Sequence, residues 1–237
     1  MALANAAIDM APPGPANEAW LRLLDEQPLW EPDGTGLLVV APHPDDETLG
    51  AGGLIASVAR RQKPVTVVSV TDGEVAYSNW SGLAAIRRAE LKRALHNLSP
   101  HMILQVRLGL PDGGVRRHER LLRRSLTGLV TKGVVLVAPY EQDGHPDHDV
   151  VGRVCLEVAR AHTLSIVRYP IRAWRLAAWH ALRQARWGRF ELSAEAREAK
   201  HRAIGAFVSQ LRPPFRQPRV PEDVVPYFER PYEAFLL

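Results

Sequence analysis

The sequence predicts an α/β fold with a Rossmann-like, doubly wound and mostly parallel sheet, helices on both faces and an irregular C-terminal extension. Short, continuous apolar runs alternate with longer segments of helical pattern along residues 36–170, which is the pattern of repeated β-α-β units. The runs are apolar at nearly every position, as is typical of parallel strands buried on both faces. Residues 171–237 lose this alternation.

A proline-containing arm and one short helix, at 19–24, are expected before the first strand. Five buried strands are expected at 36–41, 65–70, 102–108, 134–138 and 164–169. Four helices are expected between them, at 49–61, 81–98, 117–131 and 148–161. Right-handed crossovers then place helices on both faces. With the common strand order 3-2-1-4-5, the first and fourth strands are neighbours.

The C-terminal third is expected to be less regular. Ser193 is placed to cap a helix that runs to about residue 211, with Glu195 in its first turn. The proline-rich tail, 213–237, is expected to wrap the surface as extended segments. The tryptophans of the stretch 172–190, which is rich in Trp and Arg, either cap one wall of the crevice or pack the C-terminal lobe; alternatively, the stretch contacts a membrane surface or an acidic substrate.

Length and composition favour a single domain over the whole chain, 1–237. The 237 residues are 46% apolar, which is enough to bury a sizeable core and argues against disorder. Within this domain we expect an N-terminal arm and short helix (1–35), a core sheet (36–170) and a C-terminal lobe (171–237).

The composition also argues against several classes of protein. No stretch approaches the roughly 20 consecutive apolar residues of a membrane span, and the N-terminus lacks a secretory pattern, so a cytoplasmic protein without stable membrane insertion is expected. The net charge of +4 is scattered, unlike the clustered footprint of nucleic-acid-binding proteins. The single cysteine, Cys155, excludes a disulfide framework and is expected to be buried. The sequence selects no oligomeric state.

Two motifs combine histidines with carboxylates at the ends of expected strands. Pro-His-Pro-Asp-Asp-Glu, residues 42–47, follows the first strand, and His-Pro-Asp-His, residues 145–148, follows the fourth. In an open parallel sheet, ligands bind at the carboxyl ends of the strands where the strand order reverses. Because the first and fourth strands are neighbours there, we expect the two motifs to lie together.

Histidines and carboxylates gathered in one crevice are typical of a metal site. Catalytic zinc takes three nitrogen or oxygen ligands from the protein and keeps one position open. His43, Asp46 and a histidine of the second motif can supply these ligands; the spacing alone does not say which histidine. A carboxylate beside the ion can act as general base. An imidazolium opposite it can stabilise an oxyanion or protonate a leaving amine.

A purely structural explanation exists for each motif alone. Carboxylates in the first turn of a helix are favoured by the helix dipole and by capping. The match of two such motifs at paired strand ends favours the metal site.

The two motifs resemble those of the LmbE-like, or PIG-L, family of zinc-dependent N-deacetylases. Further segments are similar to family patterns: Thr-Asp-Gly-Glu at 71–74, Arg-Arg-Ala-Glu at 87–90, Leu-Gly-Leu-Pro-Asp-Gly at 108–113, and Lys200, Ala203, Ser209 and Gln210. The resemblance covers about residues 36–211. It implies an enzyme that hydrolyses an N-acetyl group on an amino sugar or its glycoconjugate, releasing the free amine and acetate, with one zinc ion per chain.

The resemblance implies a role for each residue of the two motifs. His43, Asp46 and His148 would bind zinc. Asp45 would act as the general base. His145 would act as the electrophilic or general-acid histidine.

Three further residues are candidates for binding an N-acylated sugar substrate: Arg88, Asp112 and Asp143. Arg88 either contacts substrate or forms a surface ion pair. Asp143, two residues before His145, could alternatively orient an imidazole or face solvent.

Two other functions remain open from the residues alone. A non-catalytic ligand- or nucleotide-binding module would explain the fold but not the two motifs, and the phosphate-binding glycine fingerprint is absent. A phosphate-ester hydrolase would need two metal ions and more carboxylate ligands. The number of metal ions bound per chain distinguishes the three.

Overall fold

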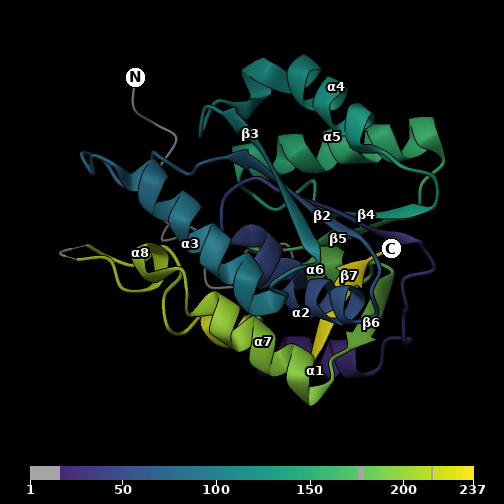
Figure 1. The fold of residues 1–237 in the computed structure, drawn as a ribbon. Coiled ribbons are helices and arrows are strands. Elements are labelled where there is room, and N and C mark those ends of the chain that lie inside the picture. The colour runs from purple at the N-terminus through teal and green to yellow at the C-terminus, as the bar shows by residue number, and fades with distance from the viewer. Residues whose placement is uncertain (1–16, 176–178, 215) are drawn as a thin grey trace.

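A single seven-stranded sheet runs through the molecule, with helices on both of its faces (Figure 1). The computed structural model describes residues 17–175, 179–214 and 216–237. The strand order is β3-β2-β1-β4-β5-β7-β6. The predicted α/β class and the predicted order of the first five strands are therefore confirmed.

The five predicted strands are β1 (Gly36–Ala41), β2 (Val65–Thr71), β3 (Ile103–Leu110), β4 (Val134–Pro139) and β5 (Ile166–Tyr169). All of their pairings with one another are parallel. β1 lies at the centre, between β2 and β4, with Val39 opposite Val137 of β4. The carboxyl ends of β1 and β4 consequently lie side by side, as the strand order predicts.

The helices of the core are α1 (Asn17–Asp25), α2 (Asp46–Arg60), α3 (Leu83–Leu98), α4 (Glu119–Leu129) and α5 (Pro146–His162). α2 and α5 begin two or three residues earlier than expected. Asp46 and Glu47 of the first motif and Asp147 of the second lie in their first turns, where the positive end of the helix dipole favours negative charge. Between β3 and α4 the chain makes a short 3-10 helix, Val115–His118.

The two faces of the sheet carry separate apolar cores. α4 and α5 cover one face, and α2, α3 and α7 (Ala194–Ile204) cover the other (Figure 1). Cys155 belongs to the α5 core and is fully buried, which confirms the expectation for this residue. No helix in the described part of the chain is long and apolar enough to cross a membrane.

The prediction for the C-terminal tail is wrong. Residues Tyr232–Leu236 form β7, which is buried at every position and lies inside the sheet, between β5 and β6 (Trp187–Glu191). β7 runs antiparallel to both neighbours. The many prolines before residue 232 hid this short strand from the sequence analysis. The C-terminal segment completes the core sheet and does not wrap around it. The division into a single domain with three parts stays a prediction.

The helix that begins after Ser193 is shorter than predicted. Ser193 does cap α7, accepting the backbone N–H of Ala196 at 3.2 Å, but α7 ends at Ile204 and a separate helix, α8, spans Val208–Leu211. The buried carboxylate of Glu90 on α3 stabilises the start of α8, because it accepts the backbone N–H and the hydroxyl of Ser209 at 2.7 and 2.6 Å.

The tryptophans of the Trp- and Arg-rich stretch pack the C-terminal lobe, one of the alternatives expected. Trp174, in the 3-10 helix Ala173–Arg175, stacks on Trp187 with ring centroids 5.5 Å apart, and Trp20 of α1 meets Trp174 edge-on at 4.9 Å. Residues 176–178 of this stretch lie outside the described residues. The lobe also holds the short helices α6 (Trp179–Leu182) and Val225–Tyr227.

A buried carboxylate from β7 holds α2 at a break in its helical backbone. Ala51 has non-helical angles (φ −145°, ψ 17°), so the helix effectively restarts there. Glu233 accepts the backbone N–H groups of Gly53 and Leu54 at 2.7 and 2.8 Å, and Lys200 of α7 donates to it at 2.6 Å. This contact joins α2, α7 and β7 behind the start of α2, which carries half of the predicted site.

Close approach explains the glycines around this break. A Cβ on Gly50 would lie 2.2 Å from the ring of Tyr169, and one on Gly53 would lie 2.5 Å from the side chain of Leu192. Both distances are far inside van der Waals contact. The helix can therefore lie against β5 and β6 only because these positions have no side chain.

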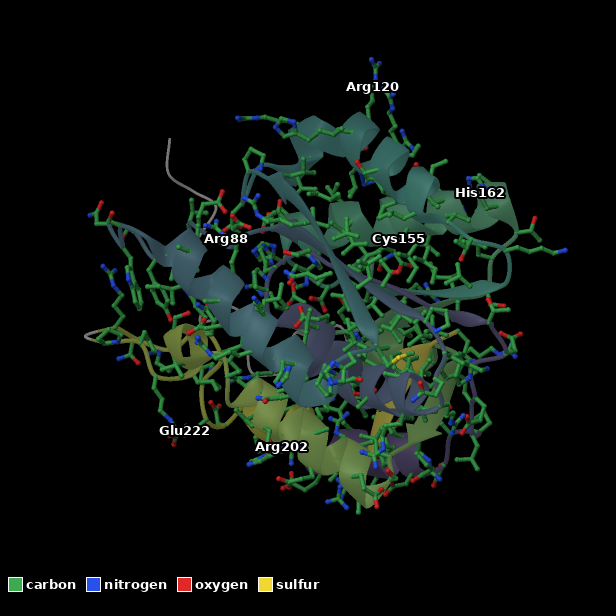
Figure 2. The ribbon with its side chains drawn as sticks, in the orientation of Figure 1. Arg88, Arg120, Cys155, His162, Arg202 and Glu222 are labelled. Atoms are coloured by element: carbon green, nitrogen blue, oxygen red, sulfur yellow. The ribbon has the colours of Figure 1, made fainter. Side chains whose placement is uncertain are left out.

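We predict that Glu233→Gln destabilises the protein strongly. The change leaves the buried ammonium of Lys200 uncompensated, and breaking a buried pair in this way costs about 3–5 kcal/mol. Urea denaturation measures the free energy of unfolding. The control is Glu198→Gln, which removes an exposed pair with Arg202 on the outer side of α7 (Figure 2) and should cost no more than about 1 kcal/mol. Equal losses in the two variants would contradict a structural role for Glu233.

Candidate active site

The two predicted motifs meet at the carboxyl ends of β1 and β4. The first motif follows β1 and enters α2, and the second precedes and enters α5. His43, Asp45 and Asp46 from the first motif line one cavity together with His145 and His148 from the second. All five motif residues predicted to act are thus brought together.

Three atoms of these side chains form a nearly equilateral triangle. His43 Nδ1 lies 3.2 Å from Asp46 Oδ2 and 3.1 Å from His148 Nε2, and the latter two atoms are 3.3 Å apart. Ligands that share one tetrahedral zinc ion at 2.0–2.1 Å are expected to lie about 3.3–3.4 Å from one another. The donor set therefore fits such an ion in both chemistry and spacing, without rearrangement of the backbone.

Each histidine of the triangle is held from behind by carboxylates. His43 Nε2 lies 3.2 Å from Asp112 and 3.4 Å from Asp147, while His148 Nδ1 donates to Asp143 at 2.8 Å. A hydrogen bond at the far ring nitrogen fixes the tautomer and orients the ring, as is usual for metal-binding histidines. The near nitrogens, His43 Nδ1 and His148 Nε2, are left free to act as ligands.

The surrounding carboxylates make this a place that attracts positive charge. Burial alone would lower the pKa of His43, but hydrogen bonds to Asp112, Asp147 and Asp46 raise it well above its ordinary value. Burial likewise lowers the pKa of His148, but the charge of Asp46 and the hydrogen bonds to Asp143 and Asp46 outweigh it and raise that pKa to about 9. A divalent cation can take the place of the protons that these histidines would otherwise hold.

Two of the three residues expected to bind substrate are placed elsewhere. Asp143 is fully buried; besides His148 it accepts the backbone N–H groups of Ile171, Arg172 and Ala173 at 2.8–3.0 Å. It orients an imidazole, which is the alternative that the sequence left open, because every direction around its carboxylate is already occupied by the protein.

Arg88 lies on α3 (Figure 2) but is not among the residues that line the cavity. Its guanidinium pairs with Asp72 at 2.6 Å, so the ion-pair alternative describes its contacts. Asp112 does line the cavity, but one oxygen faces His43 and the other accepts the backbone N–H of Val75 at 2.9 Å.

Asp45 has a strained backbone. Its φ of 132° lies in the region that favours glycine, and such conformations cost about 1–3 kcal/mol and cluster at functional sites. Two buried groups hold it there. Glu47 accepts the Asp45 N–H at 3.2 Å, and Arg87 lies 3.1 Å from the Asp45 carboxylate while donating to the carbonyl of Pro44 at 2.6 Å.

The two adjacent aspartates have opposite electrostatics. Burial raises the pKa of Asp45 to about 7, against the opposing charge of Arg87. Burial acts on Asp46 in the same direction, but His148 and His43 outweigh it and hold the pKa of Asp46 well below its usual range. Asp46 is therefore fixed as an anion, whereas Asp45 can gain and lose a proton near neutral pH. Burial also raises the pKa of Glu47, to about 8.

His145 is placed as a hydrogen-bond donor. Its Nδ1 accepts the backbone N–H of Asp147 at 3.2 Å, which leaves the proton of the neutral ring on Nε2. Burial, followed by the charges of His148 and His43, lowers the pKa of His145 to about 2. These observations favour a neutral imidazole over the imidazolium that the sequence suggests.

Sequence reasoning missed Arg87 and chose its neighbour. Arg87 is 3% exposed and lines the cavity. It shares the buried stripe of α3 with Leu83 and Leu91, four residues before and after it, so the helical period contained the signal. Arg172, Gln210 and Arg219 also line the cavity. Arg172 and Arg219 come from irregular segments, and Gln210 comes from the four-residue helix α8, which is too short to show such a period.

Comparison with known proteins supports the resemblance carried by the motifs. Residues 38–159, about half of the chain, match the family described as GlcNAc-PI de-N-acetylase (PIG-L). The chain is 37% identical over 155 residues to the 1D-myo-inositol 2-acetamido-2-deoxy-alpha-D-glucopyranoside deacetylase of Nocardia farcinica, a match that covers 53% of this chain and 52% of the relative.

It is 30% identical over 131 residues to a probable N-acetyl-alpha-D-glucosaminyl L-malate deacetylase 2 of Bacillus subtilis, covering 51% of this chain and 58% of the relative. The chain therefore spans about half the length of these curated relatives.

The fold is similar to that of the N,N'-diacetylchitobiose deacetylase of Pyrococcus horikoshii. The TM-score is 0.62 at 24% identity, over 87% of this chain and 80% of the other. Because the family match spans the strands and both motifs that build the cavity, this chain belongs to the PIG-L, or GlcNAc-PI de-N-acetylase, family.

Proposed function

We propose that the protein is a zinc-dependent deacetylase that hydrolyses the N-acetyl group of an N-acetylglucosaminyl glycoconjugate, releasing the free amine and acetate. The observation that carries this proposal is the triangle of His43 Nδ1, Asp46 Oδ2 and His148 Nε2 beside the separately held Asp45. The curated relatives support the substrate class, since both are named as deacetylases of acetylated glucosamine conjugates.

In this proposal His43, Asp46 and His148 hold one zinc ion. Bound there, zinc would supply a Lewis acid that polarises the amide carbonyl and makes water more acidic. Asp112, Asp143 and Asp147 position the histidines.

Asp45 takes a proton from the attacking water and delivers it to the amine nitrogen as the C–N bond breaks. A pKa near the working pH suits both halves of this transfer. Neutral His145 donates from Nε2 to the oxygen that becomes negative when water adds to the carbonyl. The proton balance closes without an imidazolium, because the proton that Asp45 removes from water is the one that the amine needs.

The two competing functions have less support. Two groups of residues have ligand atoms close enough to hold a metal ion: His43, His145 and His148, and His43, Asp112 and Asp147. The second of these is engaged by the protein, because Asp147 accepts the backbone N–H groups of Gly113 and Val115 at 2.7 and 3.3 Å. This favours one ion and argues against a two-metal phosphate-ester hydrolase. A binding module would need neither the strained Asp45 nor the orienting carboxylates.

We predict that the protein releases amine from N-acetylglucosaminides and that Asp45→Asn separates catalysis from metal binding. Asn tolerates the backbone conformation but is not basic, so kcat should fall about 10²–10⁴-fold while zinc content stays near one per chain. Amine release is measured with a fluorogenic amine reagent, and zinc by elemental analysis.

Asp46→Asn is the matched variant and should instead lower the zinc content. Removal of zinc with a chelator should abolish turnover, and added zinc should restore it. Near wild-type turnover by zinc-loaded Asp45→Asn would exclude Asp45 as the base.

A second prediction concerns Asp143. Replacing it with Asn removes the charge that orients His148, and the loss of such a partner typically weakens metal binding about 10–100-fold. Competition with a chromophoric zinc chelator measures the affinity. Asp149→Asn is the control, because Asp149 lies in the first turn of the same helix and accepts backbone N–H groups, those of Gly144 and Asp143; equal zinc affinity in both variants would contradict the prediction.

A third prediction concerns the pH profile. Asp45 must be deprotonated to act as the base, so kcat/KM should rise as the pH increases through its pKa. Arg87 lowers that pKa; in Arg87→Gln the rising limb should therefore move to higher pH, by about 1–3 units. The neighbouring Arg88→Gln, which removes a pair with Asp72, should leave the limb in place. An unmoved limb in Arg87→Gln would contradict the assignment of this limb to Asp45.

A further inference from the structure

Two arginines line the cavity without a carboxylate partner. Arg172 and Arg219 both face the cavity that contains the predicted metal ligands. Within residues 17–175, 179–214 and 216–237, neither forms an ion pair, and the Nε atom of each is buried with no hydrogen-bond partner. The Nε atom of the third cavity arginine, Arg87, is also buried without a hydrogen-bond partner, but the rest of its guanidinium lies against Asp45 and two backbone carbonyls.

The backbone of both residues is firmly held. The Arg172 N–H donates to the buried carboxylate of Asp143 at 3.0 Å, directly behind His148. The Arg219 N–H donates to the carbonyl of Gln210 at 2.9 Å and lies 3.1 Å from the hydroxyl of Tyr77. The Arg219 guanidinium also covers the Tyr77 ring at 4.8 Å and donates to the carbonyl of Ala76. The cation of Arg219 is thus built into the wall, and the side chain of Arg172 extends from a fixed backbone.

The charges on this wall are incompletely balanced. Burial lowers the pKa of Arg219, and the nearby cations of Arg87 and Arg172 lower it further, whereas Tyr77 and Asp112 oppose them. The cavity therefore has carboxylates around the predicted metal ligands and guanidinium groups on another part of its lining. A bound anion would relieve the repulsion among these cations.

We propose that Arg172 and Arg219 form a subsite for an oxyanion, a carboxylate or phosphate group, carried on the part of the glycoconjugate beyond the sugar. The inference rests on the proposed function, because it names the class of glycoconjugate that the same cavity takes. Guanidinium groups suit the planar, paired acceptors of such anions. An acidic substrate is then preferred over a neutral one of the same size.

The test uses glycosides of N-acetylglucosamine that differ in one group: carboxymethyl and phosphonomethyl glycosides, which are anionic, and the carbamoylmethyl glycoside, which is neutral and nearly isosteric with the first. The wild-type kcat/KM should be about 10- to 100-fold higher for at least one anionic glycoside, the usual worth of a charged hydrogen bond. The phosphonate and carboxylate arms identify which oxyanion the subsite takes. Equal kcat/KM for all three would overturn the proposal.

The ratio of kcat/KM for the preferred anionic glycoside to kcat/KM for the neutral one should fall toward one in Arg172→Gln and in Arg219→Gln. Arg172→Lys should keep part of this ratio. Arg120→Gln is the control with the same change of charge, because Arg120 lies on α4 and points away from the body of the molecule (Figure 2). A preference that survives in both cavity variants, or that falls equally in the control, would overturn the proposal.

A binding measurement separates this inference from the proposed function. Calorimetry measures how tightly the protein binds the corresponding anionic and neutral glycosides of glucosamine. These are products that carry no acetyl group, so their binding is measured without any reaction. If no acetylated glycoside releases amine, the proposed deacetylase function fails, yet tighter binding of an anionic glycoside that is lost in Arg172→Gln or Arg219→Gln still supports the subsite. Equal binding of the anionic and neutral glycosides, or binding of neither, overturns the subsite whatever the activity.

Discussion

The parallel pairing of β1 with β4 is the constraint on which the site depends. It fixes the carboxyl ends of two central strands next to each other, so that His43 and His148, 105 residues apart in the chain, lie within 3.1 Å. α2 and α5 begin a few residues after these strands end, within the two motifs. The motifs therefore lie at the positive ends of two helices. The sheet thus gathers negatively charged side chains where backbone electrostatics stabilise them.

A dense set of buried acids follows from this arrangement, and each has a specific partner. Asp143, Asp147 and Glu47 bind backbone N–H groups, Asp46 faces two imidazoles, and Glu233 caps the restart of α2 while pairing with Lys200. Partners of this kind are necessary, because an unpaired buried charge is prohibitively unfavourable. The C-terminal strand β7 therefore contributes to the site indirectly, through its carboxylate behind α2.

The parallel core could be predicted from the sequence because the signals for its strands and helices are local. Apolar runs of strand length and the intervening helical segments follow from neighbouring residues, and the strand order then brings the two motifs together. Contacts between segments that are distant in the sequence could not be predicted in this way. Asp143 is committed to His148 by backbone groups that follow β5, and β7 is a strand only because β5 and β6 flank it. Arg87 is the exception, since its place on the buried stripe of α3 could have been read from the helical period.

The contrast between Asp45 and Asp46 shows how the fold gives different chemistry to identical side chains. The two residues are adjacent in the sequence, and both are buried. The positive φ at Asp45 breaks the regular helical path between them, so that one carboxylate meets Arg87 and the other meets two histidines. Two imidazoles stabilise the anion of Asp46 more than burial destabilises it, whereas the single guanidinium beside Asp45 does not outweigh burial. The strain at Asp45 is therefore the structural origin of a pair in which one acid is held as an anion and the other can exchange a proton.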